Sequence, residues 1–141
     1  LQPEGQTRRP HIDPPSLEIS ARSYIIYDPK SRMVIDGKNE FLQFSQASAT
    51  KIMTALVSLD HYNLEDVLIA RNMENVKGSK MDLIEGEAMT VESLLYGLML
   101  PSGNDAAAVL SQNFPGGQKE FIENMNQKAA ELKLLNTFLS R

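Results

Sequence analysis

The chain has 141 residues, the length of one ordinary domain, and 42% hydrophobic with 23% charged residues is typical of a soluble globular protein. Its formal net charge of −4 argues against a nucleic-acid partner, because surfaces that bind phosphates concentrate Lys and Arg. The absence of cysteine excludes thiolate metal sites, cysteine nucleophiles and disulfides. No apolar run approaches the length of a membrane span.

Residues 1–20 are predicted to form an extended arm. This stretch contains four prolines, which resist both helix and sheet: Pro3, Pro10, Pro14 and Pro15. Because the chain begins with Leu1 rather than Met, we expect an upstream segment, such as a cleaved signal peptide.

A β-hairpin and a helix are predicted next. Two β-rich runs, 24–27 and 33–35, flank the turn signal Asp28-Pro29-Lys30-Ser31, which predicts a hairpin over residues 23–35. Apolar residues then recur at helical spacing and predict a helix from near Ser48 to about Asp60.

The rest of the chain is predicted to be mainly helical. Residues 64–70 fit either helix or strand, and Gly78-Ser79 indicates a loop. Thr90 is the expected N-cap of a helix that Pro101 ends, and Asp105 is the expected cap of the next. A last amphipathic helix follows the break at 115–117. Two strands followed by several helices indicate an α+β fold, whose remaining strands we expect beyond Arg141.

The first candidate site is Ser48-Ala49-Thr50-Lys51, an S-x-x-K tetrad at a predicted helix start. Residues three apart on a helix share a face, with Cβ atoms roughly 5–6 Å apart. A Lys51 amine kept neutral by burial or a neighbouring cation can therefore act as base toward the Ser48 hydroxyl. Backbone N–H groups at the helix start would point at a developing oxyanion. Alone, the tetrad also fits an N-capping serine followed by a solvated lysine.

The second candidate site is Ser102-Gly103-Asn104, between Pro101 and Asp105 in a predicted interhelical loop. Such a loop can present a hydroxyl and a carboxamide to the same cleft, for proton relay and for hydrogen bonding to a substrate amide. Considered alone, the tripeptide is more typical of a proline stop, a glycine turn and a helix cap.

Together the two motifs resemble the first two motifs of the serine penicillin-binding protein and β-lactamase superfamily. The flanking residues extend this resemblance. Residues 24–31 resemble the family's first strand and turn, and 47–56 its nucleophile helix. Gly78-Ser79-Lys80-Met81 and Glu85-Gly86-Glu87 match the loop before the next helix, and 90–107 match low-molecular-mass D,D-carboxypeptidases. The chain is identified as the N-terminal part of a serine-type D-alanyl-D-alanine carboxypeptidase of peptidase family S11.

The resemblance implies a penicillin-binding/β-lactamase-like transpeptidase fold and four catalytic residues. Ser48 would attack the carbonyl of the penultimate D-alanine and form an acyl-enzyme, while its backbone N–H forms half of the oxyanion hole. Lys51 would take the proton of Ser48. Ser102 would pass a proton to the leaving D-alanine, and Asn104 would position the acyl chain and hydrogen-bond Lys51 or substrate.

The family's third motif, K-T-G, does not occur in the 141 residues. Its strand would supply the cation for the substrate carboxylate and the second oxyanion N–H, and one lost donor costs roughly 3–4 kcal/mol in other serine enzymes. We therefore expect residues 21–141 to be the N-terminal portion of a catalytic domain, inactive alone. We also expect it to self-associate or to bind a C-terminal fragment that completes the sheet.

The resemblance implies an extracytoplasmic enzyme, in the periplasm or on the wall side of the membrane, that acts on the D-Ala-D-Ala end of peptidoglycan stem peptides and binds β-lactams. No cofactor and no metal are expected, since nothing pairs His11 and His61 as ligands. Two alternatives stay open. A serine β-lactamase usually has Ser-Asp-Asn in place of Ser102-Gly103-Asn104, and a non-catalytic β-lactam- or peptidoglycan-binding remnant needs no third motif.

Overall fold

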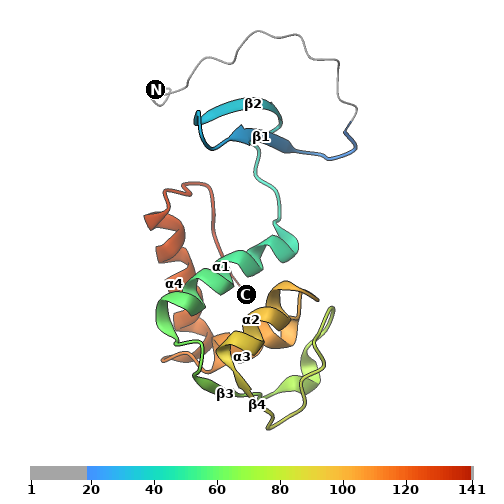
Figure 1. Cartoon of the computed structure of the whole chain (residues 1–141), viewed down its shortest axis with the longest axis vertical. Coiled ribbons are helices and arrows are strands. Elements are labelled where there is room, and N and C mark those ends of the chain that lie inside the picture. The colour runs from blue at the N-terminus through green and yellow to red at the C-terminus, as the bar shows by residue number, and fades with distance from the viewer. Residues whose placement is uncertain (1–18, 141) are drawn as a thin grey trace. The chain divides into compact units, whose positions relative to one another are not determined.

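The computed structural model describes residues 19–140, which belong to two compact units, residues 19–44 and residues 45–140. Figure 1 shows the first unit as a hairpin and the second as a group of helices with a small sheet. The arm predicted over residues 1–20 lies almost entirely outside the described residues.

The first unit confirms the predicted hairpin. Strands β1 (Tyr24–Asp28) and β2 (Met33–Lys38) pair in antiparallel fashion, so the second strand runs three residues further than predicted. The Asp28 carboxylate fixes the turn, because it accepts hydrogen bonds from the Ser31 hydroxyl at 2.6 Å and from the Lys30 backbone N–H at 3.0 Å.

The second unit contains the four predicted helices. Its elements are η1 (Ala47–Ala49), α1 (Thr50–His61), β3 (Val67–Ile69), η2 (Met73–Asn75), β4 (Ala88–Thr90), α2 (Val91–Met99), α3 (Asn104–Gln112) and α4 (Gly117–Glu131). Helix α1 contacts α2, α3 and α4. Helix α3 in turn contacts β3, α2 and α4, so both helices join the earlier elements of this unit to α4.

A second two-stranded sheet lies in the part of the chain that was predicted to be mainly helical, with residues 64–70 left open. Residues 64–70, which fitted either helix or strand, contain β3. This strand pairs antiparallel with β4, with Val67 opposite Thr90 and Ile69 opposite Ala88. Strands of three residues are too short for an alternating pattern to show. The α+β class is confirmed, with one sheet more than the sequence indicated.

Two clusters of buried side chains form the core of the second unit. One joins β3, α2 and α3 and includes Leu94 and Leu98, both fully buried. The other joins α1 to α4 and includes Val57, Phe121 and Met125. Each helix therefore buries one apolar face, as its amphipathic pattern predicts.

Tyr62, the residue after α1, packs against both clusters. Its hydroxyl donates to the Leu110 carbonyl at 3.0 Å, in the last turn of α3, where carbonyls have no partner within the helix. Burial, together with the nearby Asp66 carboxylate, raises the pKa of Tyr62 to about 12.

Of the two helix caps predicted from the sequence, one is correct and one is wrong. Thr90 caps α2 as expected, since its hydroxyl accepts the Ser93 backbone N–H at 3.2 Å. Asp105 is not the cap of α3. The helix begins two residues earlier than that cap implies, at Asn104, with Gly103 as the N-cap residue, and the Asp105 carboxylate accepts backbone N–H groups of the 81–83 segment.

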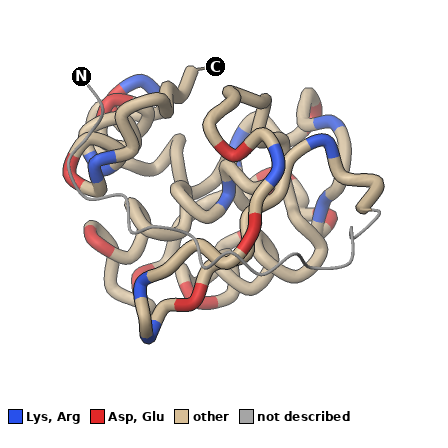
Figure 2. The backbone as a smooth tube through the Cα atoms, turned by 90° about the horizontal axis from the view of Figure 1, so that it is seen from above, with Lys and Arg blue, Asp and Glu red and all other residues tan. Residues whose placement is uncertain are grey.

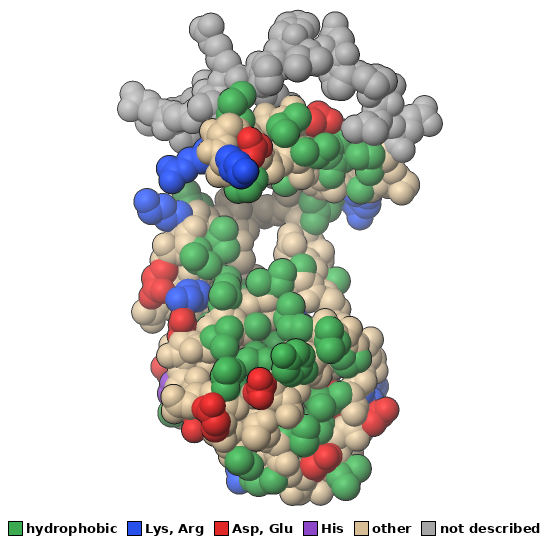
Figure 3. Space-filling view, viewed as in Figure 1, with side chains coloured by type: hydrophobic (Ala, Val, Ile, Leu, Met, Phe, Trp, Pro, Cys, Tyr) green, Lys and Arg blue, Asp and Glu red, His purple; other side chains and the backbone are tan. Residues whose placement is uncertain are grey.

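Surface charge and apolar surface are distributed differently. Basic and acidic residues are interspersed along the described backbone (Figure 2). Hydrophobic side chains gather on the face of the 45–140 unit seen in Figure 3, and the exposed apolar residues of this unit include Ile52, Leu59, Tyr96, Met99 and Leu100. Within residues 19–140, no helix combines the length and the apolar character needed to cross a membrane.

Candidate active site

Lys51 and Asn104 lie in direct contact, although 53 positions separate them in sequence. Lys51 belongs to the first turn of α1 and Asn104 is the first residue of α3. Because these helices pack against each other, the Lys51 Nζ donates a hydrogen bond of 2.7 Å to the Asn104 Oδ1. The fold thus brings the S-x-x-K and Ser-Gly-Asn motifs together.

The loop over residues 77–83 holds Asn104 on its other side. The Asn104 Nδ2 donates to the Lys77 carbonyl at 2.6 Å, and the Asn104 backbone N–H donates to the Ser79 carbonyl at 2.8 Å. A carbonyl only accepts hydrogen bonds, so the carboxamide must turn its nitrogen toward Lys77 and its oxygen toward Lys51. The orientation of this amide is therefore determined by its partners.

Ser48 and Ser102 lie beside this pair in the chain. Ser48 is exposed in η1, three residues before Lys51 and on the same helical path into α1. Ser102 is half-buried between α2 and α3 and has a left-handed backbone with φ of 59°. That conformation costs a residue with a Cβ roughly 1–2 kcal/mol. Among the described residues, no hydrogen bond joins either hydroxyl to Lys51 or Asn104.

The surroundings of Gly103 explain why the Ser-Gly-Asn tripeptide has glycine at its centre. Its backbone N–H donates to the Gly97 carbonyl at 2.9 Å, which ties the loop to the last turns of α2. A Cβ on Gly103 would lie 2.7 Å from that same carbonyl oxygen and 2.9 Å from the Asp105 Oδ1. The close approach therefore requires a residue without a side chain.

Asp105 is the one fully buried carboxylate among the described residues, with 1% of its surface exposed. It accepts hydrogen bonds from three backbone N–H groups, those of Met81, Leu83 and Ala106, at 2.9–3.1 Å. Burial acts to raise the pKa of Asp105, but these bonds outweigh it, so its pKa lies below the ordinary value. The carboxylate is charged at neutral pH and attaches the 81–83 segment to the start of α3.

Sequence reasoning missed the part played by residues 77–83. The Lys77 and Ser79 groups that hold Asn104 are backbone carbonyls, which carry no residue-specific signal. Gly78 offered a signal, because it has φ of 85°, and a Cβ there would lie 2.7 Å from the Asn104 Nδ2. Its place in a Gly-Ser loop was recognised from sequence, but its proximity to Asn104 was not.

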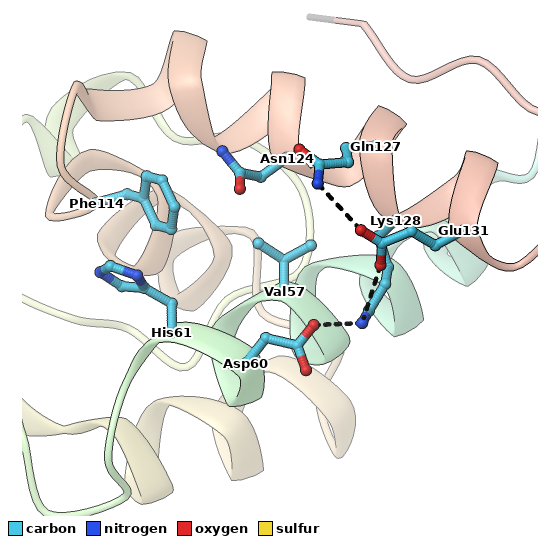
Figure 4. A pocket seen from close by; sticks show the side chains of 8 residues that line it. All are labelled: Val57, Asp60, His61, Phe114, Asn124, Gln127, Lys128 and Glu131. Atoms are coloured by element: carbon cyan, nitrogen blue, oxygen red, sulfur yellow. Dashed lines mark hydrogen bonds and ion pairs between the residues drawn. The ribbon is translucent and has the colours of Figure 1, made fainter.

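Two hollows adjoin α1 in the second unit. One, of about 300 Å³, opens beside Asn104 and is lined by residues of α1, α3 and α4, among them Thr54, Ser111 and Phe121. The other, of about 130 Å³, lies at the opposite end of α1 (Figure 4) and is lined by Val57, Asp60, His61, Phe114, Asn124, Gln127, Lys128 and Glu131.

The hollow of Figure 4 holds none of the predicted catalytic residues. Lys128 lies between two carboxylates, 2.5 Å from Asp60 and 3.6 Å from Glu131. The hydrogen bond to Asp60 raises the pKa of Lys128. His61 packs on the Phe114 ring at 4.4 Å between centroids. In the part of the chain that the structure describes, no three His, Asp or Glu side chains form a metal site.

Comparison with solved structures defines the class of fold. The chain resembles penicillin-binding protein 6B from Escherichia coli with a TM-score of 0.80 and 32% identity, over 94% of this chain and 45% of that one. Residues 19–140 thus have the helices and small sheets of the penicillin-binding D,D-peptidase fold. The sequence profile of the D-alanyl-D-alanine carboxypeptidases, peptidase family S11, matches residues 8–140, and the chain belongs to this family.

Two curated relatives show how far the similarity extends. The D-alanyl-D-alanine carboxypeptidase DacF of Bacillus subtilis is 35% identical over 86% of this chain and 33% of its own length. A D-alanyl-D-alanine endopeptidase of Pseudomonas aeruginosa is 34% identical over 88% of this chain and 41% of its own. The chain therefore spans about a third to two-fifths of the relatives that it matches.

Proposed function

We propose that the full gene product is a serine D,D-carboxypeptidase that removes the terminal D-alanine from peptidoglycan pentapeptides and is inhibited by β-lactams. The hydrogen bond between Lys51 and Asn104 carries this proposal, because it brings the Ser-Gly-Asn motif to the lysine that lies three residues after the candidate nucleophile. Family membership supports the reaction class.

In the proposed reaction, the Ser48 Oγ attacks the penultimate D-alanine carbonyl while Lys51 accepts the Ser48 proton. The backbone N–H of Ser48, at the start of the helical path into α1, contributes to the oxyanion site. When the C–N bond breaks, Ser102 relays to the leaving D-alanine amine the proton that Lys51 took from Ser48, so both side chains return to their starting states. Water then hydrolyses the Ser48 ester and releases the shortened peptide.

Asn104 has a double part in this scheme. Its side-chain oxygen accepts a hydrogen bond from the Lys51 amine, and the residue lines the hollow of about 300 Å³. We infer that it holds Lys51 in place and contacts the acyl chain of the substrate. The substrate implies a location outside the cytoplasm, in the periplasm or at the cell wall, and no cofactor enters any step.

Acylation by benzylpenicillin tests the nucleophile. The full gene product should form a covalent adduct that peptide mapping by mass spectrometry places on Ser48, and Ser48→Ala should abolish it. An adduct on Ser102 in the wild-type protein would refute the assignment. Release of D-alanine from a D-Ala-D-Ala peptide then separates a carboxypeptidase from an endopeptidase, and steady turnover of the antibiotic would instead indicate a β-lactamase.

The isolated 141-residue polypeptide is expected to associate. Within the described residues β1 and β2 pair only with each other, and Ile25, Tyr27 and Ile35 are at least half exposed. Unpaired strand edges with apolar side chains invite pairing with another chain. Light scattering should show dimers or larger species, or a C-terminal fragment should copurify, and the polypeptide should release no D-alanine. A stable, active monomer would contradict both expectations.

A further inference from the structure

Asn104 occupies the centre of the candidate site, yet most of its contacts are to the loop over residues 77–83. We propose that Gly78 and Asp105 are positioning residues, which hold this loop so that the Asn104 carboxamide keeps its oxygen on Lys51. The consequence for catalysis rests on the proposed function, whereas the control of the Asn104 orientation does not.

Asp105 fixes the far end of the loop. Its carboxylate accepts the Met81 and Leu83 backbone N–H groups, both at 3.0 Å to the nearer oxygen, and it follows Asn104 directly in the chain. Since the carboxylate is 1% exposed, water cannot replace these bonds when they are lost. The loop and the first turn of α3 are therefore joined at a point adjacent to Asn104.

Gly78 sets how closely the near end of the loop approaches. The Lys77 carbonyl reaches the Asn104 Nδ2 at 2.6 Å only because residue 78 has no Cβ, which would lie 2.7 Å from the same nitrogen. The backbone at Gly78 also has φ of 85°, which glycine adopts freely. Any side chain at this position must displace the loop or the carboxamide.

Displacement of the loop would remove the constraint on the amide. Without the Lys77 carbonyl, the bond from Lys51 is the one side-chain hydrogen bond among the described residues that still orients the Asn104 carboxamide, so the carboxamide can turn away from Lys51 more easily. An NH₂ group offers only donors, so it cannot accept the hydrogen bond that Lys51 now donates at 2.7 Å. The position of the Lys51 amine relative to Ser48 is thus controlled from a loop that contains neither motif.

Two glycines provide a matched pair for the test. Gly78→Ala and Gly86→Ala make the same change at φ of 85° and 82°, so both incur similar backbone strain. A Cβ at Gly86 has no atom within 4 Å, whereas one at Gly78 meets Asn104. The difference between the two variants therefore isolates the contact with Asn104, and neither variant changes the charge.

The first readout is the side-chain NH₂ signal of Asn104 in the ¹⁵N-labelled full gene product, assigned by its loss in Asn104→Ala. Gly78→Ala should increase hydrogen exchange of this group at least about fivefold, because its bond to Lys77 is lost, while Gly86→Ala should leave it unchanged. Asp105→Asn should act like Gly78→Ala. Its control is Asp66→Asn, which alters a carboxylate that accepts the Asn63 backbone N–H away from Asn104.

The second readout is the rate of acylation by benzylpenicillin. Gly78→Ala should slow it about ten- to a hundredfold, since misplacement on the order of 1 Å has effects of this size, and Gly86→Ala should stay within about twofold. Equal exchange and equal acylation in the two glycine variants would overturn the proposal. If the wild-type protein is not acylated at all, the proposed function fails, and the exchange comparison alone decides the positioning role.

Discussion

The two ends of α1 each adjoin a polar cluster centred on a lysine, and the two clusters are built differently. At the N-terminal end, Lys51 donates to an amide whose own nitrogen is held by a backbone carbonyl, beside a carboxylate that is 1% exposed. At the C-terminal end, Lys128 lies between Asp60 and Glu131, whose side chains are 58% and 53% exposed. In the first cluster the charged side chains bond to an amide and to backbone groups, whereas in the second they pair with exposed side chains of opposite charge.

This contrast indicates which cluster the protein depends on. A buried group that loses its hydrogen-bond partner stays desolvated without compensation, whereas the members of an exposed ion pair can bond to water instead and are screened by salt. A short distance alone does not show that a contact matters for stability or function, because the exposed Lys128–Asp60 contact is shorter than the Lys51–Asn104 contact. Substitutions at matched residues of the two clusters can therefore test the contrast directly.

The largest expected effect is that of Lys51→Arg. The variant keeps the positive charge but replaces a titratable amine by a guanidinium that stays protonated, so acylation by benzylpenicillin should fall at least about a hundredfold. Lys128→Arg makes the same change in α4, where Lys128 contacts Asp60 near the other end of α1. This variant should be acylated by benzylpenicillin at the normal rate. Near-normal acylation of Lys51→Arg would mean that Lys51 is an electrostatic partner and not the base.

A smaller effect is expected on stability from Asp105→Asn. The amide turns an NH₂ group toward backbone N–H donors in a dry site, which should reduce the free energy of unfolding by about 2–3 kcal/mol, measured by denaturant titration of helical circular dichroism. Asp60→Asn, at the exposed pair, should change it much less. If both variants lost the same free energy of unfolding, the two clusters would not differ in their contribution to stability.

The pH dependence of the same variant sharpens this test. Because folding lowers the pKa of Asp105, its contribution to stability is present above the ordinary carboxyl pKa of about 3.9 and is lost as pH falls through the lower folded value. The wild-type protein should therefore lose its advantage over Asp105→Asn only below pH of about 4. An advantage that disappears near neutral pH would contradict the assignment.

The smallest effect is expected from Lys128→Met. Its hydrogen bond with Asp60 raises the pKa of Lys128, so the contribution of the pair is present below the ordinary lysine pKa and lost as pH rises through the folded value. The denaturation midpoint should fall slightly in low salt and should not differ from wild type in about 0.5 M NaCl, where charges are screened within a few ångströms. A salt-independent loss would show that packing of the alkyl chain dominates.

Local signals predicted the hairpin and the helices well. Asp28-Pro29 gave the turn, Thr90 gave the start of α2, and Pro101 gave the break after it. Each of these residues acts through its own backbone or the nearest turn, so its effect can be inferred from a short stretch of sequence.

The parts that failed depend on contacts between distant segments. Strands β3 and β4 pair across about twenty residues and are three residues long, so neither shows a pattern by itself. Asp105 has the sequence position of a cap, but its carboxylate bonds to the backbone N–H groups of Met81 and Leu83, which belong to a distant segment. The Lys77 carbonyl that orients Asn104 belongs to the backbone, and no residue type marks it.

The partly buried phenol of Tyr62, which packs against both core clusters, gives the protein an optical reporter of its own core. The chain contains no tryptophan and four tyrosines, so its near-ultraviolet spectrum comes mainly from phenol groups. With a pKa of about 12, Tyr62 remains un-ionised in the native state at pH values where an unfolded tyrosine, with a pKa near 10, has become phenolate. Denaturation near pH of about 11 should therefore increase the near-ultraviolet absorbance of phenolate, and Tyr62→Phe should reduce that increase.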